Sequence, residues 1–298
     1  MDIMPSEIWT DVFALACTDD GYTGRALSTV SRAVHLISKP LKYQSICVVG
    51  HNQLLKLSIV LESDLSSGGR KVKYLFVASL DEPKDFDAPN GRTEIRRRFH
   101  PNPNRDEALY RILRLVSSSL LTLHIHRTAI SRQSALLEMD LPVLTELTLH
   151  GPFKPPQPTI LRPRTSFPSL RRIYIHHFAY RPAKFLQVIV HAAPLLTHLR
   201  VPQCSFTPYD IQVALGMLQP AESASDVVYL PRSLEKLVIE VDPVTSSLDS
   251  WASNARAKQF LWKLQKISDS DDRVCLVDGR SRWISVEQAK EEWLEDVL

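Results

Sequence analysis

A short apolar pattern that recurs along the chain is the feature that most constrains its fold. The pattern is apolar-x-x-apolar-x-apolar, and its clearest copies are Leu120–Ile125, Leu144–Leu149, Leu170–Ile175, Leu196–Val201 and Leu234–Ile239. The first four of these copies start 24, 26 and 26 residues apart. A repeat of about 20 to 50 residues is typical of stacked units, in which each unit completes the core of its neighbours.

Each copy predicts one short strand whose alternate residues face inward. The inward positions at the centre of the strands form the predicted core: Leu123, Leu147, Ile173, Leu199 and Leu237. Helix-like stretches separate the strands, at residues 53–61, 105–116, 182–191 and 209–218. Strands that alternate with helices predict a parallel sheet with right-handed crossovers.

These units resemble leucine-rich repeats, since Leu196–Phe206 fits the longer form of that motif with Cys204 at its polar position. The resemblance implies an α/β leucine-rich-repeat-like solenoid with parallel strands over residues 46–245. Weaker copies at Tyr43–Val48 and Val72–Val77 extend the series toward the N-terminus. Residues 84–104 are rich in Pro and Asn and are predicted to form an exposed insertion.

Residues 3–43 are predicted to form three short helices. Pro5 suits the first position of a helix, and Ile8, Val12 and Leu15 then recur on one face. About forty residues cannot bury such faces among themselves, so we expect a partner surface.

The N-terminal region also resembles an F-box. The resemblance is carried by Pro5–Trp9, Val12–Phe13, Leu27–Arg32 and Pro40–Leu41, and it covers residues 1–45. It implies a three-helix module that docks on the Skp-type adaptor of an SCF ubiquitin ligase. The adaptor-binding residues that it implies are Pro5, Ile8, Val12, Phe13, Leu27 and Val30. The alternative is an amphipathic helical cap for the repeats.

The last segment, residues 246–298, is predicted to be a C-terminal cap. A helix at 251–267, a strand at 273–277 and a final helix at 286–298 bearing Trp293 would cover the open end of the array. The whole chain is therefore predicted to be α+β, with a three-helix F-box before the solenoid.

Composition and motifs argue against an enzyme. The sequence has no P-loop, no dinucleotide-binding glycine motif, no zinc-protease motif and no nucleophile elbow. Its four cysteines stand far apart and the net charge is only +3. We expect no catalytic residue, no cofactor, no metal, no nucleic acid and no membrane span. The N-terminus is unlike a signal peptide, so an intracellular protein, cytoplasmic or nuclear, is expected.

The strand residues that alternate with the core are predicted to bind a target protein. The candidates are His124, His126, Glu146, His150, Arg172, Tyr174, His176 and Arg200. Tyr and Arg often anchor protein interfaces. The alternatives are an ordinary solvated sheet face, a metal ion held by the histidine row, and target binding by the loop at 152–168.

The sequence therefore predicts the substrate-recruiting subunit of an SCF-type ubiquitin ligase, with an unidentified target. The alternatives are a repeat scaffold that does not assemble a ligase, and an enzyme whose site lies in the loops.

Overall fold

A computed structural model describes residues 4–63, 71–79, 103–127, 139–151, 166–176, 185–202, 207–219, 229–241, 251–279 and 284–297. Most of the predicted insertion at 84–104 lies outside these ranges, as do Cys204 and most of the loop at 152–168. The chain forms two compact units. Unit 1 comprises residues 1–129, 141–144 and 285–298, and unit 2 comprises residues 130–140 and 145–284.

Unit 1 begins with the three predicted helices: α1 (Ser6–Ala16), α2 (Tyr22–Val30) and α3 (Arg32–Ser38). Gly21 precedes α2 with a φ of 87°, and a Cβ there would lie 2.9 Å from the carbonyl oxygen of Ser45. The left-handed backbone conformation and the close approach to Ser45 both favour glycine at this position. Ser31 caps α3, because its side chain accepts a hydrogen bond from the amide of Val34 at 3.2 Å.

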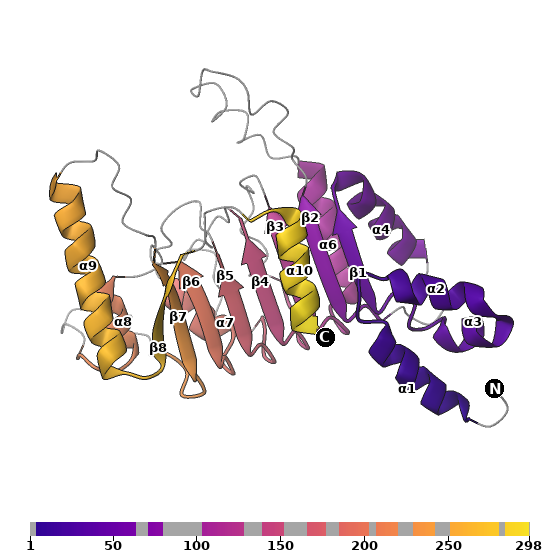
Figure 1. The fold of residues 1–298 in the computed structure, drawn as a ribbon, viewed down its shortest axis with the longest axis horizontal. Coiled ribbons are helices and arrows are strands. Elements are labelled where there is room, and N and C mark those ends of the chain that lie inside the picture. Colours follow the sequence, from indigo (N-terminus) through magenta and orange to yellow (C-terminus); the bar gives the residue numbers. More distant parts are fainter. Residues whose placement is uncertain are drawn as a thin grey trace, which may run out of the picture. The chain divides into compact units, whose positions relative to one another are not determined.

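Three parallel strands follow in unit 1: β1 (Ser45–Val49), β2 (Tyr74–Ser79) and β3 (Thr122–Arg127). Helices α4 (His51–Ser63) and α6 (Pro103–Val116) connect them and pack on each other (Figure 1). The register aligns Ile46, Leu75 and Leu123 across the three strands. The alternate apolar residues thus form the inner layer, as the repeat pattern predicts.

Unit 2 continues the same plan with strands whose described pairings are all parallel. Its strands are β4 (Glu146–His150), β5 (Arg172–Ile175), β6 (His198–Pro202), β7 (Lys236–Val241) and β8 (Val274–Asp278). Its helices are α7 (Phe185–Ala192), α8 (Pro208–Ala214) and α9 (Trp251–Ser270). A capping box begins α8, because Thr207 and Asp210 exchange side-chain-to-backbone hydrogen bonds.

The predicted core is confirmed. Leu123, Leu147, Ile173, Leu199 and Leu237 are each at most 1% exposed. In unit 2 the register aligns the last four of these residues in one row. The chain is α/β with parallel strands in chain order within each unit, which is compatible with the predicted solenoid.

The C-terminal segment has the predicted elements, but the last helix lies elsewhere than predicted. Strand β8 pairs with β7, and α9 buries Leu264 and Ile267 in unit 2. Helix α10 (Val286–Val297) instead belongs to unit 1 and packs on β2 and β3 (Figure 1). Its prediction as part of a terminal cap was therefore wrong. Within the described ranges, no helix is both long and apolar enough to cross a bilayer.

Candidate functional site

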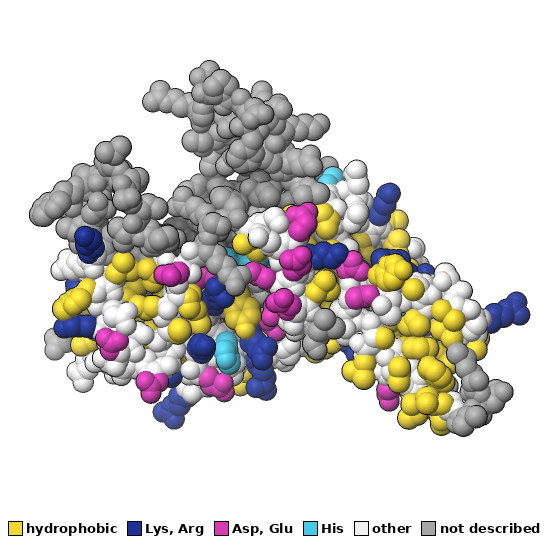
Figure 2. All heavy atoms as spheres, in the orientation of Figure 1, with side chains coloured by type: hydrophobic (Ala, Val, Ile, Leu, Met, Phe, Trp, Pro, Cys, Tyr) yellow, Lys and Arg dark blue, Asp and Glu magenta, His cyan; other side chains and the backbone are white. Residues whose placement is uncertain are grey.

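The N-terminal helices expose a concentration of large apolar side chains. Figure 2 shows it as a yellow area over α1, α2 and α3. We call it the apolar helix surface and define it by five residues that are 45% to 78% exposed: Ile8, Val12, Leu15, Val30 and Leu36. Ile8, Val12 and Leu15 follow one another at helical spacing on α1. Exposed apolar patches of this kind commonly mark protein-binding sites.

The predicted adaptor residues divide into exposed and buried ones. Pro5, Ile8, Val12 and Val30 are exposed, and Leu27 is half-buried. Phe13 is buried, and its ring centroid lies 5.5 Å from that of Trp9. Because Phe13 directly follows Val12 in α1, its side chain points to a different side of the helix, toward the helical core. Its prediction as a contact residue was therefore wrong.

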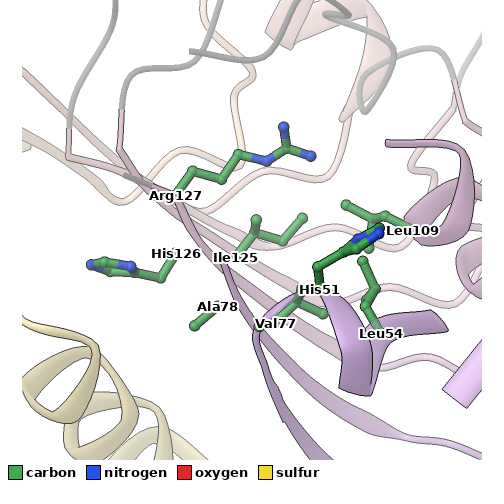
Figure 3. A pocket seen from close by; sticks show the side chains of 9 residues that line it. His51, Leu54, Val77, Ala78, Leu109, Ile125, His126 and Arg127 are labelled. Carbon is green, nitrogen blue, oxygen red and sulfur yellow. The ribbon is translucent and has the colours of Figure 1, made fainter. Parts of the chain in front are cut away.

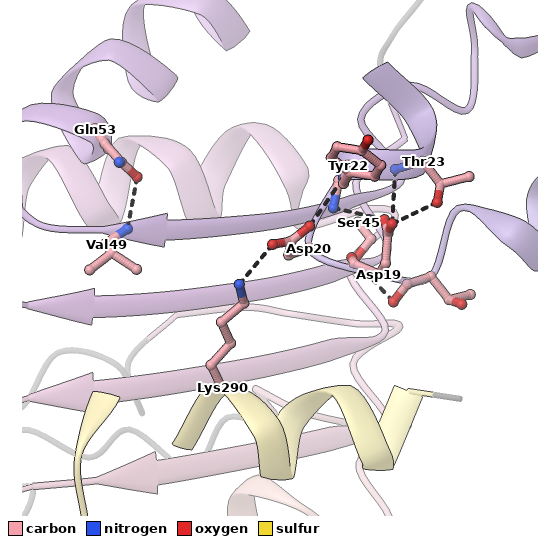
Figure 4. Close-up of polar contacts among 10 residues, drawn as sticks. Asp19, Asp20, Tyr22, Thr23, Ser45, Val49, Gln53 and Lys290 are labelled. Carbon is pink, nitrogen blue, oxygen red and sulfur yellow. Dashed lines mark hydrogen bonds and ion pairs between the residues drawn. The ribbon is translucent and has the colours of Figure 1, made fainter. Parts of the chain in front are cut away.

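A hydrogen-bond network holds these helices on the strands of unit 1 (Figure 4). The carboxylate of Asp19 accepts bonds from the amides of Gly21 at 2.9 Å and Thr23 at 2.8 Å, which fixes the start of α2. The hydroxyl of Ser45 in β1 donates to the carbonyl oxygen of Asp19. Gln44 donates from Nε2 to the carbonyl oxygen of Ala14 in α1, at 2.7 Å. Together these bonds join the start of β1 and the residue before it to α1 and to the turn before α2.

An ion pair adds α10 to this network. Lys290 Nζ lies 2.7 Å from Asp20 Oδ2, and Figure 4 shows the lysine extending from α10 toward the turn before α2. The hydrogen bond from Lys290 and its positive charge lower the pKa of the Asp20 carboxyl, although partial burial opposes the shift. The same bond raises the pKa of Lys290. The charged forms of both side chains are therefore favoured.

Helix α10 covers the sheet face on which two target-binding residues were predicted. Phe76 in β2 lies 5.5 Å, centroid to centroid, from the fully buried Trp293 and 5.0 Å from His124. His124 and His126 are only 1% and 3% exposed. The prediction that they line an open face was wrong, because Phe76 and Trp293 make this face part of the apolar core.

A pocket lies at the ends of β1, β2 and β3. Val77 and Ile125 line it together with Leu54 of α4 and Leu109 of α6 (Figure 3). The room that it offers to the centre of a water-sized molecule is about 10 Å³, enough for roughly one water molecule. The pocket is too small to hold an organic substrate.

The sheet face of unit 2 holds the other predicted target-binding residues. Arg172 is exposed, and Tyr174, His176 and Arg200 are half-buried. Glu146 and His150 are buried, so these two do not offer the open surface that was predicted for them. The register aligns Tyr174 with Arg200, as the repeat pattern predicts.

A buried carboxylate, that of Glu240, organises one end of this face. It was not among the predicted target-binding residues. Glu240 accepts a hydrogen bond from Arg200 Nε at 2.6 Å and contacts His176 Nδ1 at 2.9 Å. Burial raises the pKa of Glu240, but the bonds and charges of His176 and Arg200 together lower it below its ordinary value. The rings of His150 and His176 stack, with centroids 3.9 Å apart. The alternation of residues along β7 puts Glu240 on the same face as Lys236 and Val238, and this alternation is the signal in the sequence that could have found it.

Among the side chains that the structure describes, no three His, Cys, Asp or Glu residues are placed to hold a metal ion. The arrangement suits binding through two surfaces, one apolar on the helices of unit 1 and one charged on the sheet of unit 2. The chain matches no protein-family model and no curated protein.

Proposed function

We propose that the chain is the substrate-recruiting subunit of an SCF-type ubiquitin ligase. Its N-terminal helices would bind the Skp-type adaptor, and its strand-rich region would bind a target protein. The single observation that carries the proposal is the exposed apolar helix surface, which overlaps with the residues of the F-box resemblance. Ile8, Val12 and Val30 belong to both sets.

The apolar helix surface would supply part of the free energy of an interface. Full burial of one large aliphatic side chain contributes about 1.5–3 kcal/mol. If a partner covered these five side chains, which are 45% to 78% exposed, the gross gain would be on the order of 5–9 kcal/mol. Association costs reduce that figure, so further contacts at the rim, such as Pro5 and Leu27, would be needed.

Recruitment of this kind requires no chemistry in the chain itself. Two binding surfaces on one molecule raise the effective concentration of a target near the ubiquitin-charged enzyme. The Ser45 and Gln44 hydrogen bonds hold the turn before α2 and α1 in place within unit 1, which gives the apolar helix surface a fixed support.

The test is binding of the purified Skp-type adaptor to the intact protein, measured by biolayer interferometry. Changing Val12 and Val30 together to Asp places two charges in the proposed interface, where desolvation costs several kcal/mol. We expect affinity to fall at least a hundredfold. Both side chains are exposed, so the melting temperature should hold.

A matched control makes the same chemical change on another helix. Ile59 and Val60 of α4 are also exposed apolar residues, and the double change Ile59→Asp with Val60→Asp should leave adaptor affinity unchanged. Equal binding by the Val12/Val30 variant and the wild type would refute the proposal. It would favour a repeat scaffold that does not assemble a ligase.

A further inference from the structure

The sheet face of unit 2 carries basic side chains in a defined row. The register places Arg172 of β5, His198 of β6 and Lys236 of β7 side by side. Arg200 occupies the next row on the same face, two residues along β6. We call Arg172, His198, Arg200 and Lys236 the basic sheet face.

Two carboxylates among the described strand residues of this face, those of Glu146 and Glu240, are already engaged and buried. Glu146 Oε2 lies 3.6 Å from Arg172 Nη1, and its side chain is only 10% exposed. Glu240, with a side chain 7% exposed, is held by Arg200 and His176. An approaching molecule would therefore meet positive groups and little negative charge.

The cationic groups themselves remain open to solvent. The side chain of Arg172 is 53% exposed, and Lys236 is also exposed. Arg200 bonds Glu240 through Nε, and a guanidinium carries further N–H donors beyond that one. Between the cations lie the half-buried apolar side chains of Tyr174 and Val238. The face thus combines charge with a partly apolar floor.

We propose that the basic sheet face binds an acidic segment of the recruited protein, with carboxylates over Arg172 and Lys236 and an apolar side chain over Tyr174 and Val238. The proposal rests on the proposed function only in taking the segment to be part of a recruited target. Arg172 and Lys236 stand two strands apart, which is about 10 Å. Acidic residues three positions apart in an extended chain span the same distance.

A polypeptide fits these features better than a nucleic acid does. Nucleic-acid sites gather many cations to neutralise phosphates. Here buried carboxylates lie among the cations and aliphatic surface lies between them. The geometry therefore favours a segment with few charges and at least one apolar side chain.

The experiment selects a random twelve-residue peptide library on the intact protein in the absence of adaptor. We expect the enriched peptides to share two acidic residues about three positions apart, beside an aliphatic or aromatic residue. The affinity of a synthetic copy, measured by fluorescence anisotropy, should fall at least tenfold when Arg172 and Lys236 are both changed to Glu. Lys236→Glu alone should weaken binding at least threefold, and it leaves the contact between Arg172 and Glu146 in place.

The control makes the same charge change on the helices of unit 1, with Lys56→Glu and Arg114→Glu, both at exposed positions. Peptide affinity should then stay within about twofold of the wild type. The proposal is overturned if no peptide is enriched, if the enriched peptides lack acidic residues, or if Lys236→Glu binds as the wild type does. It is also overturned if a twelve-nucleotide single-stranded RNA binds more tightly than the selected peptide.

Loss of adaptor binding would leave all of these peptide results unchanged. Failure of this inference and failure of the proposed function can therefore be told apart.

Discussion

At the scale of single residues, strand alternation decides which side chains are buried. Leu199 is fully buried and aligns with Ile173 and Leu237, whereas the neighbouring Arg200 turns to the other face. The sequence predicts this row because a strand has a period of two. It does not predict that Phe13 is buried, since a short amphipathic helix has two apolar flanks and only tertiary packing decides which one is covered.

The pair of Asp20 and Lys290 offers a test at the residue scale. Changing Lys290 to Met should remove the interaction that lowers the pKa of Asp20. The pair is partly exposed, so we expect a loss of about 0.3–1 kcal/mol in the free energy of unfolding at pH 7. The measurement is chemical denaturation of the intact protein at a series of pH values.

The pH dependence follows from the direction of the two pKa shifts. A lowered carboxyl pKa stabilises the fold above its unfolded value of about 3.9, and this contribution disappears as the pH falls through the folded pKa. A raised Lys pKa contributes below its unfolded value of about 10.4 and is lost at higher pH. The difference between wild type and variant should therefore be present between about pH 4 and 10. Lys56→Met on α4 is the control, and a difference that persisted at pH 2 would argue against this assignment.

At the scale of elements, the sequence predicts α10 as a helix but does not predict where it lies. Its ion pair joins positions 270 residues apart, and no local pattern encodes such a contact. An amphipathic pattern predicts that one side of a helix will be buried, but it does not identify the element that buries it. Phe76 marks the surface that α10 covers. It is a large aromatic side chain on the sheet face opposite Leu75 and Leu123, and it contacts Trp293 of α10.

Trp293 should carry most of the energy that holds α10 in place. It is fully buried against Phe76, so Trp293→Ala should cost about 3–5 kcal/mol of the free energy of unfolding. Trp262→Ala is the matched control, because that side chain is 57% exposed on α9, where Lys266 Nζ lies 3.9 Å from the centre of its ring. We expect a change of about 0.5–1 kcal/mol there. Denaturation curves would rule out this packing if the two variants lost equal stability.

At the scale of the whole molecule, the order of the modules could be predicted from the sequence. Three helices precede an array of parallel strands; the helical spacing of the apolar residues indicated the former, and the repeat spacing indicated the latter. The spread of the C-terminal segment over two units was not accessible, because α9 and β8 extend unit 2 whereas α10 returns to unit 1. One consequence is that only the sheet face of unit 2 remains as the predicted open binding face.

The central claim is that the helices α1, α2 and α3 are the surface that binds the adaptor. Hydrogen–deuterium exchange of the intact protein, with and without saturating Skp-type adaptor, tests it most directly. We predict slower exchange in peptides covering residues 6–38 and unchanged exchange in peptides covering β4 to β7. No protection anywhere, or protection confined to the strands of unit 2, would contradict the claim.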